Sequence, residues 1–125
     1  MITLDTNYIV RFFTRDVESQ FLEAKKVIVD KNSEKYISPI ILAETIYILE
    51  NHYMLGKNEV ISAISDLLAI KSIKTAGFLR KALMIYKDES VSFYDSMIVA
   101  ETLESKYELR TFDSKLNKVY KKYLV

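Results

Sequence analysis

The chain has no cysteine, one histidine, one proline and two glycines among its 125 residues. Without cysteine it has no disulfide framework, thiolate nucleophile or thiolate zinc site, and it is compatible with a reducing compartment. The single His52 excludes a two-histidine ribonuclease mechanism, and a Ser-His-Asp triad would have to use it. We expect His52 instead to cap the end of its helix. Scarce glycine and proline leave little turn chemistry for an all-β fold and favour helices joined by short links.

Neither sign of charge is in excess, because 18 Lys and Arg residues stand against 17 Asp and Glu residues, for a net charge of +1. No global basic field marks a general nucleic-acid coat, so any RNA or DNA contact must be local. No apolar run reaches the ~18 residues of a membrane span, and the start Met-Ile-Thr-Leu-Asp-Thr lacks the basic flank of a signal peptide. We therefore expect a cytoplasmic protein that does not enter a membrane, with a single domain over residues 1–125.

Short apolar runs alternate with helical periodicities along the chain. Ser38-Pro39 is typical of a helix start, with a hydroxyl cap followed by proline in the first turn. The alternation predicts an α/β fold with a parallel sheet, helices on both of its faces, and ligands at the carboxyl ends of its strands. Strands are predicted at residues 2–4, 35–38, 73–75 and 108–112, and helices at residues 9–13, 17–29, 39–52, 58–70, 78–86, 92–106 and 114–120.

Four acidic residues stand within or directly after apolar runs. Asp5 follows Met-Ile-Thr-Leu, Glu44 lies in Leu-Ala-Glu-Thr, Asp95 lies in Phe-Tyr-Asp-Ser-Met, and Asp113 follows Thr-Phe. An ionised carboxylate in apolar surroundings must pair, raise its pKa or hold a metal. Oxygen ligands of this kind select hard cations such as Mg²⁺ or Mn²⁺ over zinc or copper. We predict one convergent metal site, which points to phosphoryl chemistry.

Each acid also has a purely structural interpretation. Asp5 and Asp113 are placed to cap the helices that begin at the next residue, and Asp95 is placed to form a capping box with Ser92. The alternative for Glu44 is a buried pair with a lysine or arginine, although no basic residue lies within a turn of it. Its helical neighbours are apolar: Ile40, Ile41, Tyr47 and Ile48. Two charges about 5 Å apart repel by about 3 kcal/mol at an effective dielectric of 20, and a shared cation would reverse that cost.

Together these segments resemble the acidic motifs of PIN-domain ribonucleases, over essentially the whole chain. They are Leu4-Asp5-Thr6-Asn7, Glu44 in Leu-Ala-Glu-Thr, Asp95 in Phe-Tyr-Asp-Ser-Met-Ile-Val-Ala, and Thr111-Phe112-Asp113. A stand-alone domain of this size most resembles the VapC toxins of bacterial and archaeal toxin–antitoxin modules. The resemblance implies a parallel sheet of about five strands, hydrolytic cutting of RNA with Mg²⁺ or Mn²⁺, a VapB-like antitoxin as partner, and a homodimer.

The same resemblance assigns roles to individual residues. Asp5, Glu44, Asp95 and Asp113 would be the metal-binding acids, and Asn7 and Thr111 would be polar helpers that hold an acid, a water or a phosphate oxygen. Some relatives carry a further acid shortly after the last motif, whereas here Ser114, Lys115 and Leu116 follow. The number of metal ions, one or two, therefore stays open.

Local basic residues are candidates for RNA contacts, with a solvated charged surface as the alternative. One group is Arg11 and Arg15; the other is Lys115, Lys118, Lys121 and Lys122, interleaved with Tyr120 and Tyr123 as stacking surfaces.

Two other functions also fit the acids. A Mg²⁺-dependent phosphatase would place an aspartate after the first strand, but Asp5-Thr6-Asn7 lacks the second aspartate of an Asp-x-Asp pattern. A non-catalytic RNA- or protein-binding module would keep the acids for an arginine-bearing partner. Metal-dependent RNA cleavage would distinguish the nuclease from both.

Overall fold

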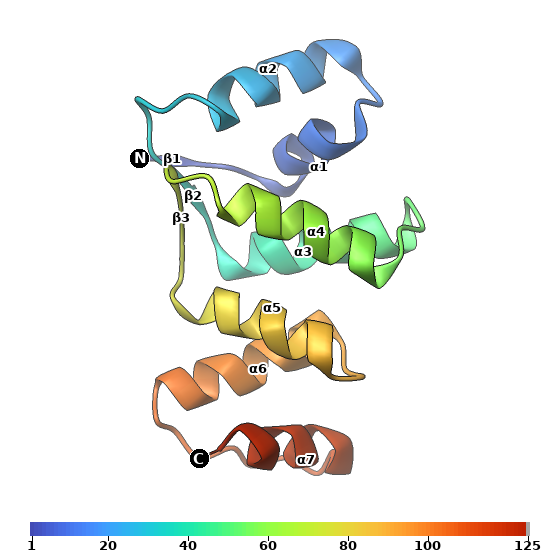
Figure 1. Ribbon diagram of the computed structural model, residues 1–125, viewed down its shortest axis with the longest axis vertical. Coiled ribbons are helices and arrows are strands. Elements are labelled where there is room, and N and C mark those ends of the chain that lie inside the picture. Colours follow the sequence, from blue (N-terminus) through green and yellow to red (C-terminus); the bar gives the residue numbers. More distant parts are fainter. Residues whose placement is uncertain (125) are drawn as a thin grey trace. The chain divides into compact units, whose positions relative to one another are not determined.

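The structure, a computed structural model, describes residues 1–124. The chain falls into two compact units, Met1–Ala76 and Gly77–Val125, and each is described by itself. The elements follow the chain from blue to red in Figure 1: β1 (Ile2–Thr3), α1 (Thr6–Thr14), α2 (Glu18–Ile28), β2 (Lys35–Ile37), α3 (Pro39–Asn51), α4 (Lys57–Leu68), β3 (Ile73–Thr75), α5 (Phe78–Asp88), α6 (Phe93–Glu104) and α7 (Ser114–Tyr123). None of these helices is long and apolar enough to cross a lipid bilayer.

Three short parallel strands form the sheet of the first unit, in the order β1-β2-β3. In its register Ile2 lies opposite Lys35, and Lys35 lies opposite Ile73. Two helices connect each pair of neighbouring strands, because a parallel pair needs a long crossover. The backbone pairing continues past β1, where Leu4 N–H donates to Tyr36 O at 3.0 Å. Asp5 therefore lies just beyond the carboxyl end of β1.

The helices of the first unit bury one apolar face each. α1 packs on α2 and α3, and α4 packs on α3 and β3. The contact between α1 and α2 includes the stacked rings of Phe12 and Phe21, whose centroids are 6.4 Å apart. The core positions recur every three or four residues, as an amphipathic helix requires: Ile9 and Val10 in α1, Phe21, Ala24 and Ile28 in α2, Leu42, Ile46 and Leu49 in α3, and Val60, Ile64 and Leu67 in α4.

A buried lysine joins the loops that lead into β2 and β3. Lys35 is fully buried. Its Nζ donates to Asp30 O at 2.6 Å, to Ser33 O at 2.8 Å and to Ser72 Oγ at 2.6 Å. All three ammonium protons thus have acceptors, which offsets the cost of removing the charge from water.

The second unit is built from three helices, with α5 packed on α6 and α6 on α7. Tyr86 and Phe93 meet edge to face, with ring centroids 5.7 Å apart. The buried residues again follow the helical period: Leu79, Ala82, Leu83 and Tyr86 in α5, Phe93, Val99 and Ala100 in α6, and Leu116, Val119 and Tyr120 in α7. No strand lies in the described part of this unit.

The predicted strand at residues 108–112 is therefore wrong, and so is the expectation of about five strands, since the structure has three among residues 1–124. The physical reason is the lack of an apolar face. None of residues 107–112 is buried, and Phe112 is fully exposed. Glu108 and Arg110 pair with each other at 3.0 Å on the surface. The other predicted strands and helices are confirmed close to their expected bounds.

Candidate functional site

Asp5 caps α1. Its Oδ1 accepts a hydrogen bond from Tyr8 N–H at 2.8 Å, which confirms the capping interpretation of this residue. The side chain is exposed, and within the first unit its Oδ2 makes no hydrogen bond. Because a carboxylate offers about four acceptor positions, capping leaves room for a further ligand. Asn7, in the first turn of α1, is exposed as well.

Glu44 lies on α3 and is held by the first residue of α1. Thr6 Oγ1 donates to Glu44 Oε2 at 2.8 Å. The expectation that Glu44 sits in apolar surroundings is wrong, because Glu44 is exposed and its helical neighbours Ile40 and Tyr47 are 64% and 55% exposed. No lysine or arginine of the first unit pairs with it, so the alternative of a buried ion pair is also wrong.

Asp95 lies in the first turn of α6 and is half-buried. Its N–H donates to Ser92 Oγ at 3.1 Å, so Ser92 is the N-cap, as predicted. The return hydrogen bond of a capping box, from Ser92 N–H to the carboxylate, is not formed within this unit. The carboxylate of Asp95 thus has no capping role in its own unit.

Asp113 caps α7, and its loop holds it in place. Its Oδ1 accepts from Lys115 N–H at 3.0 Å and from Leu116 N–H at 3.1 Å. Thr111 Oγ1 accepts from the backbone N–H of Asp113 at 3.0 Å, so this bond orders the loop in front of α7 and does not involve the carboxylate. Oδ2 of Asp113 makes no hydrogen bond inside the second unit. The capping prediction for Asp113 is confirmed, and one carboxylate oxygen remains for another ligand.

Each unit therefore contributes two of the four predicted acids. Within the described residues of either unit, no three His, Asp or Glu side chains lie close enough together to hold a metal ion. Asp5, Asp95 and Asp113 all stand at helix N-termini, where the helix dipole favours negative charge. Every one of the four acids keeps an oxygen that has no partner in its own unit. These oxygen donors suit a hard cation.

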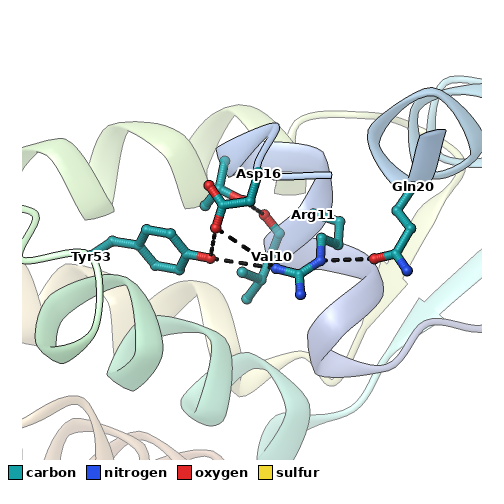
Figure 2. A network of polar contacts seen from close by, with 6 residues as sticks. Val10, Arg11, Asp16, Gln20 and Tyr53 are labelled. Carbon is teal, nitrogen blue, oxygen red and sulfur yellow. Dashed lines mark hydrogen bonds and ion pairs between the residues drawn. The ribbon is translucent and has the colours of Figure 1, made fainter. Parts of the chain in front are cut away.

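Arg11 belongs to a polar network of the first unit (Figure 2). Its Nε donates to Gln20 Oε1 at 2.8 Å, and its Nη1 donates to Tyr53 OH at 3.5 Å. Nη1 also lies 3.9 Å from Asp16 Oδ2, to which Tyr53 OH donates a short hydrogen bond. Arg15, the other predicted RNA contact on this segment, stands 4.0 Å over the ring of Phe21. Both arginines thus have structural partners.

A cavity of about 340 Å³ opens beside this network and reaches Asp5. Asp5, Asn7 and Arg11 on its α1 side are residues that the sequence singles out, whereas its α2 side was not predicted. The available signal was the spacing of three polar residues on one face of α2, at intervals of three and four residues. The cavity is lined by Asp5, Asn7, Tyr8 and Arg11 on one side and by Ser19, Gln20 and Glu23 on the other.

The basic residues of α7 divide into two groups. Lys115, Lys118 and Lys121 are exposed. Lys122 Nζ and Tyr123 OH both contact Glu89 Oε2 at 2.8 Å. Burial, together with the hydrogen bond and charge of Glu89, raises the pKa of Tyr123 to about 12. Tyr120 is buried, so it is not a surface on which a base can stack. His52 ends α3 as its C-cap, as predicted, with N–H donating to Ile48 O at 2.8 Å.

Comparison with protein families gives a match to the PIN domain over residues 2–122, which spans both units and all four acids. The chain belongs to the PIN domain family. PIN domains are generally metal-dependent nucleases. A search of curated proteins gave no match to this PIN domain.

Proposed function

We propose that this PIN domain is an endoribonuclease that requires Mg²⁺ or Mn²⁺ and hydrolyses RNA phosphodiester bonds, with Asp5, Glu44, Asp95 and Asp113 holding the metal. The family match over residues 2–122 carries the proposal. The free carboxylate oxygens support it, since metal coordination gives each of them a partner. A bound cation of this class lowers the pKa of a water and neutralises charge on the phosphate under attack. No nucleophile from the protein is needed.

In this proposal, hydrogen bonds within the chain hold three of the acidic side chains in fixed orientations. Thr6 fixes one oxygen of Glu44, and the first turns of α1 and α7 fix one oxygen of Asp5 and of Asp113. Residues whose rotamers are held in this way lose less freedom when a cation binds. Asn7 and Thr111 stand next to these acids as polar helpers, and the exposed Lys115 and Lys118 are the RNA contacts that α7 offers.

We further propose that the protein is the toxin of a VapBC-type module, inhibited by a VapB-like antitoxin, and that it forms a homodimer. Exposed apolar side chains on the helices of the first unit support this, because they need a partner to leave water. They are Leu22 and Val29 at 55% and 47% exposure, and Ile40 and Tyr47 at 64% and 55%. A monomer in light scattering, together with no inhibitory neighbour protein, would contradict this part.

Total RNA incubated with purified protein tests the ribonuclease. We expect cleavage in Mg²⁺ or Mn²⁺, none in EDTA, and none in Asp5→Asn or Asp95→Asn, whose nearly isosteric changes leave the fold intact. Asp66→Asn is the matched control, because Asp66 is an exposed acid of α4 outside the proposed site, and it should cut RNA like the wild type. Activity that persists in EDTA or in either site variant would overturn the proposal.

The same experiment separates the other two functions. Binding of RNA without cleavage under any metal condition would indicate a non-catalytic module. Release of phosphate from small phosphomonoesters, with RNA left uncut, would indicate a phosphatase.

A further inference from the structure

The cavity between α1 and α2 has a size suited to one small ligand. Its volume of about 340 Å³ is near the lower end of the ~300–1,000 Å³ typical of small-molecule sites. Polar side chains from both helices line the cavity, and Asp5 lies at its edge. A ligand in this cavity is therefore adjacent to one of the acids proposed to hold the metal.

The hydrogen bonds inside the cavity determine which groups remain for a ligand. Arg11 Nε–H occupies Oε1 of Gln20, so the amide NH₂ of Gln20 is the group left to donate. Tyr8 OH lies 3.3 Å from Glu23 Oε2. Burial is the main cause that raises the pKa of Tyr8, and the charge and hydrogen bond of Glu23 raise it further. The Tyr8 hydroxyl therefore stays protonated and is the donor to Glu23. Oε1 of Glu23 accepts no hydrogen bond within the first unit, so the carboxylate can accept further N–H groups.

The charges of the cavity indicate the class of ligand. Asp5 and Glu23 contribute two negative charges, whereas the single positive charge of Arg11 is already shared with Asp16 at 3.9 Å. A phosphate group is therefore disfavoured in the cavity itself. A neutral ligand with N–H donors facing Glu23 and an acceptor facing Gln20 is favoured. Gln20 and Glu23 stand three residues apart on α2, so both reach the same edge of one ligand.

We infer that this cavity is a nucleobase subsite that takes guanine, from the nucleotide beside the phosphate that is cut. Guanine presents two adjacent donors, N1–H and the exocyclic N2–H₂, to Glu23, with O6 next to them as the acceptor for Gln20. Uracil presents a single N–H between two carbonyl oxygens, which the carboxylate repels. Adenine and cytosine each present one donor beside a ring acceptor. The position of the guanine in RNA rests on the proposed ribonuclease function, whereas its binding to the cavity does not.

Titrations with GMP, AMP, CMP and UMP in EDTA, monitored by NMR of the backbone amides, test the subsite without RNA cleavage. The four nucleotides share one phosphate and sugar, so differences report the base. We expect GMP to bind about tenfold more tightly than UMP and to shift the amides of Ser19, Gln20 and Glu23. Glu23→Gln should abolish the difference, because its amide turns one acceptor into a donor. Glu18→Gln, which removes the same charge from α2 outside the cavity, should retain it.

Equal affinity for the four nucleotides, or a guanine preference that survives in Glu23→Gln, would overturn the inference. Mapping of cut sites in RNA is a separate measurement, in which wild type should cut beside guanine and Glu23→Gln should lose that preference. A protein that prefers GMP but cuts no RNA would contradict the ribonuclease and leave the guanine site standing. A protein that cuts RNA with no base preference at the cut would contradict the guanine position alone.

Discussion

Thr6 holds Glu44: the hydroxyl of the first residue of α1 donates to Oε2 of the acid on α3, at 2.8 Å, across 38 positions of sequence. Thr6 is itself buried, at 7% exposure, whereas Glu44 is exposed. A fixed donor thus orients a solvated carboxylate next to the end of β1. Ordering of this kind matters more for a ligand site than for the fold, because an exposed carboxylate is already stable in water.

Thr6→Val removes that donor and keeps the shape of the side chain. We expect Mn²⁺ affinity and RNA cleavage to fall by about 10- to 100-fold, as is typical when the group that orients a ligand is lost. The free energy of unfolding should fall by only about 1 kcal/mol. Calorimetric Mn²⁺ titration and urea unfolding measure the two effects. Thr6→Ser, which keeps the hydroxyl, is the control and should bind Mn²⁺ like the wild type; normal Mn²⁺ affinity in Thr6→Val would contradict the role of this hydrogen bond.

Lys35→Met tests the buried ammonium. The substitution leaves Asp30 O, Ser33 O and Ser72 Oγ without their donor. Hydrogen bonds to a charged group contribute about 1.5–3 kcal/mol each. Methionine carries no charge that must be buried, which offsets part of this loss. We therefore expect the free energy of unfolding, measured in urea, to fall by about 3 kcal/mol. Lys31→Met, an exposed lysine of the same loop, should change it by less than about 0.5 kcal/mol. Equal stability of the two variants would show that the three hydrogen bonds do not stabilise the loops.

Features set by a few neighbouring residues could be predicted from the sequence. Ser38 caps α3 in front of Pro39, and Asp5 and Asp113 cap α1 and α7, because the side chain and the amides that it accepts from are adjacent in the chain. The core faces of the helices follow from the 3.6-residue period for the same reason. The four acids were found in this way, through their positions beside apolar runs.

Features that depend on distant residues could not be predicted in this way. Residues 108–112 have β-compatible side chains, but a strand needs a partner strand, and local composition does not supply one. Periodicity placed Glu44 on an apolar stripe but could not show that Ile40 and Tyr47 are exposed. The bond between Tyr53 and Asp16 joins residues 37 positions apart. Arg11, which lines the cavity, contacts both of these residues, and such contacts between distant residues are not visible in the sequence.

Alkaline titration tests the environment of Tyr123. Its pKa is raised from 10.0 to about 12 by burial and then by Glu89. Because the pKa is higher in the folded state, the stabilisation is fully present below pH 10 and is lost as the pH rises towards about 12. Stopped-flow absorbance follows the ionisation of the tyrosines before the chain unfolds. The ionisation near pH 12 should be absent in Tyr123→Phe, and it should occur at a lower pH in Glu89→Gln. If Tyr123→Phe instead lost an ionisation near pH 10, the raised pKa would not belong to Tyr123.

Thermal melts of Asp5→Asn distinguish a shared metal site from a helix cap alone. Asparagine retains the oxygen that caps Tyr8 N–H. If Asp5 only caps α1, losing its charge weakens the helix-dipole interaction by about 0.3–1 kcal/mol. If the four acids repel one another, stability in EDTA should be unchanged or raised.

MnCl₂ at about ten times its Kd should stabilise the wild type by about 1.4 kcal/mol, several degrees in melting temperature for a domain of this size. The variant should gain much less, because one metal-binding carboxylate is gone, whereas Asp66→Asn should gain the full shift. Equal responses of wild type and Asp5→Asn to MnCl₂, at constant ionic strength, would rule out a metal site that includes Asp5.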